Sequence, residues 1–242
     1  MEERPLEVTI IVPVRDEAES IPGLSREIDR AMEDRDYQWE CLWVDDGSRD
    51  GSLSLLQEMS GKNPRHRYLS LEENAGQSAA LTAGFSESRG AFLATLDGDG
   101  QNDPADIPRL IDILRSGEAD MVNGYRKVRR DSPVRKLSSR IANGFRNLIT
   151  GKTVRDVGCS TRAFRRECVS DLPRFAGMHR FLPTLVAMEG YRLAEVPVNH
   201  RPRLRGKTKY SIGNRLWVGL ADLFGVLWLK KRFFRFRIAG RS

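Results

Sequence analysis

The sequence predicts an α/β fold built on a mostly parallel sheet with helices on its faces. Short apolar runs rich in β-branched residues alternate with longer segments whose apolar residues recur at helical spacing. Most of the helical segments open or close on proline or glycine, as helices commonly do. Strands that alternate with helices in this way form parallel βαβ units, so we expect a Rossmann-like sheet.

Five apolar runs in the first half of the chain are expected to be strands. They are VTIIVPV (8–14), WECLWV (39–44), RYLSL (67–71), AFLATL (91–96) and ADMVNGY (119–125). The helical patterns between them are PGLSREIDRAMED (22–34), GSLSLLQEMSG (51–61), QSAALTAGFSESRG (77–90) and PADIPRLIDILRSG (104–117). Because open parallel sheets bind ligands beyond the carboxyl ends of their strands, we expect the site there.

The composition becomes more basic after residue 126. Seven Lys or Arg lie between Arg126 and Arg140, against the single acid Asp131. A helical stretch (179–190) and a strand (191–202) follow, without a repeat or a low-complexity linker. We therefore expect one large domain over residues 1–212 and a C-terminal appendage over 213–242.

The overall composition favours a globular protein with polyanionic partners. Of the 242 residues 40% are hydrophobic, which is enough for a buried core, and the net charge is +7. Three cysteines without a Cys-x-x-Cys spacing predict neither disulfides nor a zinc site, and a reducing cytosol fits them best. The charged amino terminus has no secretory signal pattern. The longest apolar tract (216–229) is shorter than the ~20 residues of a spanning helix.

Two clusters of acidic residues stand at the ends of predicted strands, VDDGSRDGS (44–52) and LDGDGQNDP (96–104). Both could be mistaken for calcium loops. The twelfth position of an EF-hand loop needs a bidentate Glu, and it is occupied here by Gln57 in the first cluster and by Pro108 in the second. Both clusters also follow strands rather than helices, so EF-hands are excluded.

The second cluster predicts a site for a divalent cation. Asp97, Asp99 and Gln101 alternate along the chain, so an extended segment would present all three on one side. Mg²⁺ and Mn²⁺ prefer such oxygen ligands and commonly share them with a substrate phosphate. A phosphatase nucleophile fits less well, because Gln101 stands where Thr or Val is usual. For Asp103, before Pro104, a helix N-cap is the better interpretation.

Four motifs stand in one order along the chain: VPVRDE (12–17), WVDDGS (43–48), LDGDGQ (96–101) and RLRGKTKYS (203–211). Together they resemble the inverting glycosyltransferases of family two, and within it the dolichol-phosphate mannosyltransferase-like enzymes that load a sugar onto a polyprenyl phosphate. The resemblance implies an A-type glycosyltransferase fold, with residues 1–212 as the catalytic domain. It also implies Mg²⁺ or Mn²⁺ as cofactor and a nucleotide sugar, GDP-mannose or a UDP-hexose, as donor.

The resemblance assigns roles to individual residues near the donor. The donor-binding residues would be Pro13, Arg15, Glu17, Val44, Asp46, Gly98, Arg203 and Lys209. The metal ligands would be Asp97, Asp99 and Gln101, and the catalytic residues Asp97, Asp99 and Arg126. The stretch NAGQSAALTAGF (74–85) resembles a family segment that packs beneath the donor, while a helix face of small residues explains it equally well.

The acceptor implied by the resemblance brings its own negative charge. A polyprenyl phosphate is ionised near neutral pH and can attack directly, whereas a sugar hydroxyl needs a general base. By resemblance, Arg126, Arg135 and Ser139 would bind the acceptor phosphate. Asp156 has a structural and a catalytic interpretation of similar weight. The three histidines show no partner pattern, although His179 could lie near the acceptor.

The C-terminal segment 213–242 combines aromatic and basic residues and predicts an amphipathic helix at a membrane interface. The basic residues of its tail are Lys230, Lys231, Arg232, Arg235, Arg237 and Arg241. Aromatic anchors with basic charge favour an anionic lipid surface. A helix packed on the body is the plainer alternative, and a homo-oligomer or a membrane partner protein are others.

The function that these observations predict is transfer of a hexose, mannose or glucose, from a nucleotide sugar to undecaprenyl or dolichyl phosphate. We expect inversion, metal dependence, a peripheral location at the cytoplasmic face of the membrane, a part in cell envelope glycan synthesis, and no nucleic acid as partner. One alternative is a transferase with a polysaccharide or other hydroxyl acceptor. The other is a noncatalytic basic module that binds membrane or nucleic acid.

Overall fold

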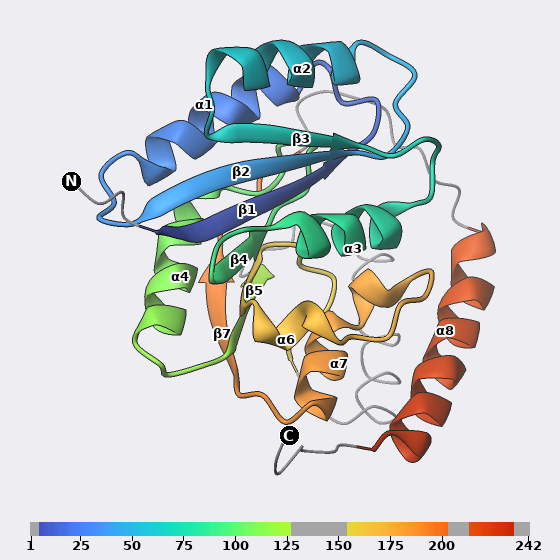
Figure 1. The fold of residues 1–242 in the computed structure, drawn as a ribbon. Coiled ribbons are helices and arrows are strands. Elements are labelled where there is room, and N and C mark those ends of the chain that lie inside the picture. Colours follow the sequence, from blue (N-terminus) through green and yellow to red (C-terminus); the bar gives the residue numbers. More distant parts are fainter. Residues whose placement is uncertain (1–4, 127–153, 203–212, 235–242) are drawn as a thin grey trace, which may run out of the picture.

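The structure, a computed structural model, describes residues 5–126, 154–202 and 213–234. A seven-stranded sheet lies at its centre, in the order β3-β2-β1-β4-β6-β5-β7 (Figure 1). The strands are β1 (Leu6–Val14), β2 (Gln38–Asp45), β3 (His66–Ser70), β4 (Phe92–Thr95), β5 (Met121–Arg126), β6 (Arg162–Arg165) and β7 (Leu193–Val198). Neighbouring strands are parallel except at β6, which runs antiparallel to both β4 and β5.

Helices cover both faces of this sheet (Figure 1). One face carries α1 (Ile21–Met32), α2 (Ser52–Lys62), the 3₁₀ turn η1 (Pro104–Asp106) and α4 (Ile107–Arg115). The other carries α3 (Gln77–Glu87), α6 (Glu167–Ser170), the 3₁₀ turn η2 (Met178–Arg180) and α7 (Leu182–Met188). The last helix, α8 (Gly213–Arg232), stands beside this second layer.

Alternation along β1 divides the interior into two hydrophobic cores. Val8, Ile10 and Val12 are fully buried against the layer of α1 and α4, and Ile11 is buried on the opposite face with α3 and α7. Burying each such side chain stabilises the fold by roughly 1.5–3 kcal/mol. Thr9, between Val8 and Ile10 in the sequence, is also buried, and its hydroxyl donates to the Glu40 carboxylate at 2.9 Å. The run 8–14 is apolar on both faces because both faces of the sheet are covered.

The predicted α/β architecture is confirmed, with one strand that the sequence did not reveal. Each of the five runs predicted in the first half of the chain forms a strand within about two residues of its expected limits. The strand predicted over 191–202 is shorter than expected, as β7, and the helical patterns form α1 to α4 and α7. Strand β6 was not predicted because it has only four residues and two of them, Arg162 and Arg165, are charged. The basic segment after residue 126 lies outside the described residues.

The apolar tract 216–229 lies within α8. On the side of the helix that faces the body, Leu223 and Val226 are buried in the second core, while Phe224 and Trp228 are 61% and 65% exposed. None of the helices in the described part of the chain is long and apolar enough to span a bilayer. The interfacial role of this helix and the domain boundary at residue 212 remain predictions.

Gly90 is the position where we expect the fold to tolerate a methyl group least. A Cβ there would lie 2.6 Å from the backbone atoms C of Val8 and N of Thr9, which cannot move without disturbing β1. We expect Gly90→Ala to lower the free energy of unfolding by about 1–3 kcal/mol. Gly61→Ala, in α2 with no atom within 4 Å, should instead stabilise by roughly 0.5–1 kcal/mol. Urea denaturation measures both, and equal effects would contradict the steric argument.

Candidate active site

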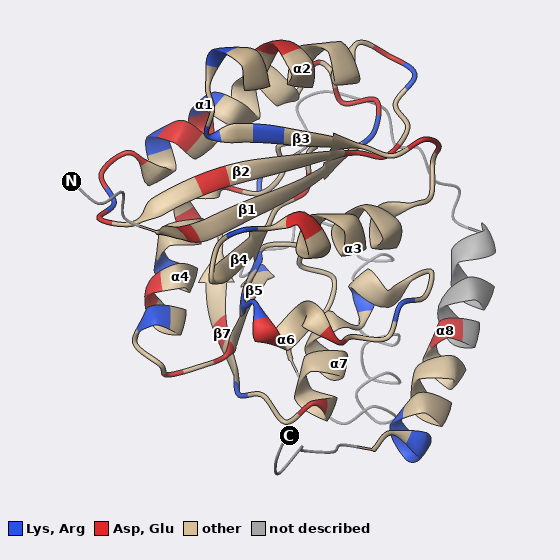
Figure 2. Ribbon diagram, viewed as in Figure 1, with Lys and Arg blue, Asp and Glu red and all other residues tan. Residues whose placement is uncertain are grey.

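A cavity of about 600 Å³ opens at the carboxyl end of the parallel strands. Strand β1 has β2 on one side and β4 on the other. The loops after β1 and β4 therefore lead to opposite sides of the sheet order, and a crevice forms between them. The lining residues are Pro13, Ala75, Gly76, Gln77, Ser78, Leu81, Thr95, Leu96, Asp97, Val157, Gly158, Cys159, Ser160, Arg162, Ala176, Gly177, His179, Arg180 and Asp222. Acidic residues gather where β1 to β3 end (Figure 2).

The loop after β1 is fixed by polar side chains from the loop after β2. Three consecutive backbone N–H groups, of residues 16–18, donate to the side chains of Ser48, Asp50 and Ser52 at 2.9–3.2 Å. Asp16 takes a positive φ of 46° in this turn, and its carboxylate accepts the N–H group of Arg49 at 2.6 Å. Much of the motif VDDGSRDGS therefore builds the rim of the site.

The predicted donor residues of the first motif lie at different depths. Pro13 lines the cavity. The Arg15 guanidinium lies 3.9 Å from the Asp16 carboxylate and is 38% exposed, and the Glu17 carboxylate accepts the Ser20 hydroxyl at 3.4 Å. These side chains stand on the rim described above, close to the end of β1.

The two predicted donor residues of β2 and its following loop are buried. The Val44 side chain is fully buried in the second core beneath α3. The Asp46 carboxylate accepts the backbone N–H of Ala75 at 2.7 Å and that of Gly76 at 3.0 and 3.1 Å. Asp46 thus holds the N-terminal end of α3 at the cavity, because Gly76 is the residue that precedes this helix.

The same helix end reaches the first predicted metal ligand. The Gln77 side-chain amide donates to Asp97 Oδ1 at 2.9 Å. Burial, and next the neighbouring Asp99 carboxylate, raise the pKa of Asp97, while Ser160 and Arg162 oppose the rise. The raised pKa means that the ionised carboxylate of Asp97 is disfavoured in the folded protein. A cation bound beside Asp97 would stabilise this ionised form.

Close packing of Gly98 keeps the two carboxylates at the end of β1. A Cβ on Gly98 would lie 2.6 Å from Val14 Cγ1 and 3.0 Å from the Pro13 carbonyl oxygen. The absence of a side chain lets the loop after β4 lie directly against β1. The predicted donor-binding role of Gly98 stays a prediction.

The third predicted ligand, Gln101, joins the acidic loop to the chain that leaves β7. Its backbone N–H donates to Asp99 Oδ1 at 3.1 Å, and its carbonyl accepts the Arg201 N–H at 2.8 Å. The Gln101 side-chain amide donates to the Arg201 carbonyl at 3.4 Å. Arg201 in turn pairs with Glu27 at 2.7 Å and Asp103 at 2.8 Å. The N-cap predicted for Asp103 is confirmed, because its carboxylate accepts the Ala105 N–H.

The residues of this loop suit a hard divalent cation that is shared with a phosphate. They offer carboxylate and amide oxygen, the ligands that Mg²⁺ and Mn²⁺ prefer, and such ions commonly take only one or two protein carboxylates. Among the residues that the structure describes, no group of three His, Cys, Asp or Glu side chains could hold a metal. The predicted metal role of Asp97, Asp99 and Gln101 stays a prediction.

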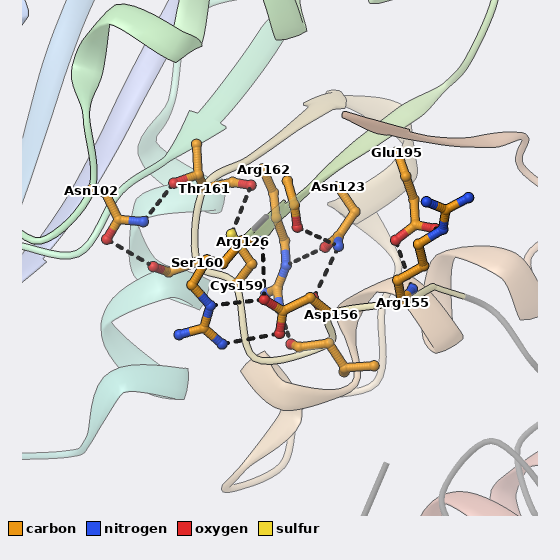
Figure 3. Close-up of polar contacts among 12 residues, drawn as sticks. Asn102, Asn123, Arg126, Arg155, Asp156, Cys159, Ser160, Thr161, Arg162 and Glu195 are labelled. Carbon is orange, nitrogen blue, oxygen red and sulfur yellow. Dashed lines mark hydrogen bonds and ion pairs between the residues drawn. The ribbon is translucent and has the colours of Figure 1, made fainter. Parts of the chain in front are cut away.

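Arg126 and Asp156, which the sequence analysis treated separately, form one pair (Figure 3). The guanidinium donates to both carboxylate oxygens, from Nε at 2.7 Å and from Nη2 at 3.0 Å, and the Arg126 backbone N–H also donates to this carboxylate at 3.3 Å. Asp156 therefore orients the arginine at the end of β5, beside Gly158, which lines the cavity. This geometry favours the structural interpretation of Asp156.

Arg162, in β6, is a buried cation in the cavity wall that the sequence analysis missed. Its three nitrogens donate to Asn123 Oδ1 at 3.0 Å and to the carbonyl oxygens of His179 at 2.8 Å and Val157 at 2.6 Å (Figure 3 shows the arginine and Asn123). Only 4% of the residue is exposed, and burial lowers its pKa. Arg162 begins a four-residue strand that also contains Arg165, so the sequence gives no local signal for such a site, and the partners of Arg162 are distant in sequence.

His179 lies on the same wall, in contact with α3. Its Nδ1 is 2.8 Å from the Ser78 hydroxyl. Burial, together with Arg180 and Arg162, lowers the pKa of His179 to about 3. Arg180 pairs with Asp222 of α8 at 3.4 Å. The C-terminal helix therefore supplies one residue of the cavity wall.

Four predicted site residues lie outside the described residues. They are Arg135, Ser139, Arg203 and Lys209. The site that the structure brings together consists of the loops after β1, β2 and β4, the start of α3, the end of β5, β6 and η2.

Comparison with known proteins identifies the family. Residues 9–172 match the family described as glycosyl transferase family 2, and the chain belongs to it. The family resemblance seen in the sequence is thus confirmed.

Two curated relatives have sequences similar to nearly the whole chain. Dodecaprenyl-phosphate galacturonate synthase of Rhizobium johnstonii is 36% identical over 230 residues, which are 93% of this chain and 68% of the relative. Undecaprenyl-phosphate 4-deoxy-4-formamido-L-arabinose transferase of Salmonella choleraesuis is 40% identical over 205 residues, 84% of this chain and 62% of the relative. The chain thus spans about two thirds of the length of these relatives.

Solved structures share the fold. Glucosyl-3-phosphoglycerate synthase of Mycobacterium tuberculosis, in complex with Mn²⁺ and UDP-glucose, has a TM-score of 0.69 and 18% identity, covering 95% of this chain and 80% of that one. A mannosyltransferase of Pyrobaculum calidifontis, in complex with GDP-Man and Mn²⁺, has a TM-score of 0.61 and 21% identity, covering 97% and 66%. The predicted A-type glycosyltransferase fold is confirmed.

The lowered pKa of His179 should appear in the pH dependence of stability. The pKa of His179 is near 6.5 in the unfolded chain and about 3 in the folded chain. The contribution of this histidine to the free energy of unfolding is therefore fully present above pH 6.5 and is lost as the pH falls toward 3. Relative to His179→Gln, the wild-type free energy of unfolding should fall by about 1.4 kcal/mol per unit between roughly pH 6 and 5. Urea denaturation at several pH values measures this difference, and parallel curves for the two proteins would contradict it.

Proposed function

We propose that this protein transfers a sugar, with inversion, from a nucleoside diphosphate sugar to a polyprenyl phosphate. The observation that carries the proposal is the charge in and beside the cavity. Asp97 of the loop after β4 and Arg162 of β6 both line it, and Arg126 of β5 lies beside the lining residue Gly158. Membership of glycosyl transferase family 2 supports an enzyme over a noncatalytic basic module. The names of the two curated relatives support polyprenyl phosphate as acceptor.

The donor binds at the crevice beside β1 in this proposal. Asp97, Asp99 and Gln101 hold Mg²⁺ or Mn²⁺, which when bound neutralises charge on the departing nucleoside diphosphate. Pro13, Arg15 and Glu17 on the fixed rim lie near the base and ribose. Asp46 and Val44 support this subsite from beneath, through α3 and the core. The predicted roles of Arg203 and Lys209 at the diphosphate complete the donor site.

The described lining of the cavity favours an acceptor that is already ionised. His179 has a pKa of about 3 and burial raises the pKa of Cys159, so neither is suited to take a proton from a hydroxyl acceptor near pH 7. Of the two carboxylates in the described lining, Asp97 is assigned here to the metal and Asp222 pairs with Arg180. A polyprenyl phosphate needs no such base, whereas the alternative polysaccharide or other hydroxyl acceptor does. Its phosphate would bind at arginines, and we propose Arg126 together with Arg135 and Ser139.

The sugar is proposed to be a hexose or a derivative of one. Mannose and glucose were the sugars expected from the sequence, and the name of the Rhizobium relative extends the class to a hexuronate. The donor would be GDP-mannose or a UDP-hexose.

A lipid acceptor also requires a membrane surface, and we propose that α8 docks on anionic lipid. Phe224 and Trp228, one helical turn apart, are exposed. Lys230, Lys231 and Arg232 follow at the end of the helix, where Figure 2 shows the basic residues together. Exposed aromatic residues beside basic charge suit an anionic bilayer surface. This arrangement would bring the cavity wall at Asp222 close to the lipid.

Incubation with radiolabelled donor, undecaprenyl phosphate and Mn²⁺ tests the function directly. GDP-mannose, UDP-glucose and UDP-galacturonate are each supplied, and we expect a chloroform-soluble sugar lipid from one of them. Asp99→Asn should lower its rate of formation at least about a hundredfold, because a carboxylate ligand of the cation is lost. Asp34→Asn, an exposed carboxylate in the turn after α1, is the matched control and should keep full activity.

Either of two results in this assay would count against the proposal. Full activity of the Asp99→Asn protein would remove the metal assignment. No sugar lipid from any of the three donors, with protein that is folded by circular dichroism, would remove the proposed transfer to polyprenyl phosphate.

Vesicle sedimentation tests the proposed lipid surface of α8. Replacing Phe224 and Trp228 together by serine should weaken binding to phosphatidylglycerol vesicles at least about tenfold, because burial of each aromatic ring contributes roughly 1.5–3 kcal/mol. Tyr68→Ser removes an exposed aromatic ring from β3, on a different part of the molecule, and should leave binding unchanged. Equal binding by the double variant and the wild type would contradict the membrane role, and a change in oligomeric state instead would indicate self-association.

A further inference from the structure

The Ser78 hydroxyl determines which nitrogen of His179 carries the ring proton. Ser78 Oγ lies 3.0 Å from the backbone nitrogen of Gly177, 3.4 Å from that of His179 and 2.8 Å from His179 Nδ1. A hydroxyl has one hydrogen and two lone pairs, and a backbone N–H can only donate. Both lone pairs therefore accept from the backbone, and the hydroxyl hydrogen goes to Nδ1. The neutral ring must carry its own proton on Nε2.

The environment of the ring keeps it neutral. Burial and the nearby guanidinium groups of Arg180 and Arg162 all disfavour the charged imidazolium and lower the pKa of His179. The Arg162 guanidinium also donates to the His179 carbonyl at 2.8 Å, so the backbone is fixed as well as the ring. Near neutral pH the side chain is a donor at Nε2 and has no free basic nitrogen.

The ring lies in the wall of the cavity that the acidic loop after β4 also lines. His179 lines the same cavity as Asp97, and among the described residues none accepts a hydrogen bond from its Nε2. Beside it, Arg180 and Asp222 form a pair that also lines the cavity. The chain at Gly177 lies directly against α8, since a Cβ there would be 2.6 Å from Asp222 Oδ2. A fixed, uncharged donor and an ion pair thus form one wall.

We propose that His179 contacts the transferred sugar, with its Nε2–H donating to a hydroxyl or carboxyl oxygen of that sugar. Arg180 and Asp222 complete this subsite. This inference rests on the proposed function as a nucleotide-sugar transferase and names a specificity residue for it. An uncharged donor supplies a directional hydrogen bond and no net positive charge. It does discriminate between sugars, because a site built to bind a hydroxyl rejects an analogue without one.

Binding of donors without any lipid tests the contact. Calorimetric titration, with Mn²⁺ present, gives the Kd of UDP-glucose, UDP-galacturonate and GDP-mannose and of the diphosphates UDP and GDP. We expect His179→Ala to weaken the sugar nucleotide by about 2- to 10-fold while the Kd of the diphosphate alone changes little. His179→Gln, whose amide nitrogen can take the place of Nε2, should restore much of the loss.

The proton position is tested independently by nitrogen NMR of the histidine ring. In the wild type we expect the proton on Nε2. Ser78→Ala should release the ring into a mixture of tautomers, whereas Thr82→Ala removes a hydroxyl one turn along α3 that does not bond His179 and should leave the spectrum unchanged. These spectra are recorded without substrate, so they do not depend on activity.

The results separate this inference from the proposed function. Wild-type protein that binds none of the three sugar nucleotides would refute the transferase and the sugar contact with it. If the wild type binds a sugar nucleotide but His179→Ala weakens it and its diphosphate equally, only the contact at His179 is refuted. A proton on Nδ1 in the wild type would also overturn the inference, whatever the binding data.

Discussion

The buried guanidinium of Arg162 connects the three segments that form the inner wall of the site. It donates to Asn123 in β5, to the Val157 carbonyl before β6 and to the His179 carbonyl in η2. All three acceptors are neutral, so the cation is held by hydrogen bonds and its charge remains to act on the Asp97 carboxylate. Loss of the arginine would leave three buried acceptors without a donor, and the wall would lose its shape.

A second set of contacts fixes the start of α3 at the cavity. The Asp46 carboxylate fixes Gly76 before α3, and the next residue, Gln77, donates to Asp97. One turn of the same helix also presents Ser78 to His179. A single helix end therefore orients the candidate metal ligand and the candidate sugar contact, which explains why the small residues of this stretch lie at the cavity.

The fold could be predicted from local patterns because each buried strand and amphipathic helix has a signature of its own. Strand β6 escaped this reasoning because a four-residue segment with two arginines has no such signature. Asp46 shows a similar difficulty at the site. The sequence shows that Asp46 follows β2. It does not show that the Asp46 carboxylate accepts two backbone N–H groups, because these belong to a loop about thirty residues away. Hydrogen-bond partners of that kind are set by tertiary packing.

By itself the sequence determined the α/β class, the family and the acidic loop with Asp97 and Asp99, because periodicity and motif order are properties of neighbouring residues. Tertiary structure alone decided that Arg126 pairs with Asp156, that Arg162 is a buried cation and that His179 bonds to Ser78. The physical reason is that charge, burial and proton position depend on partners brought together from distant parts of the chain. Those partners, rather than residue types, determine what each polar group at the cavity can do.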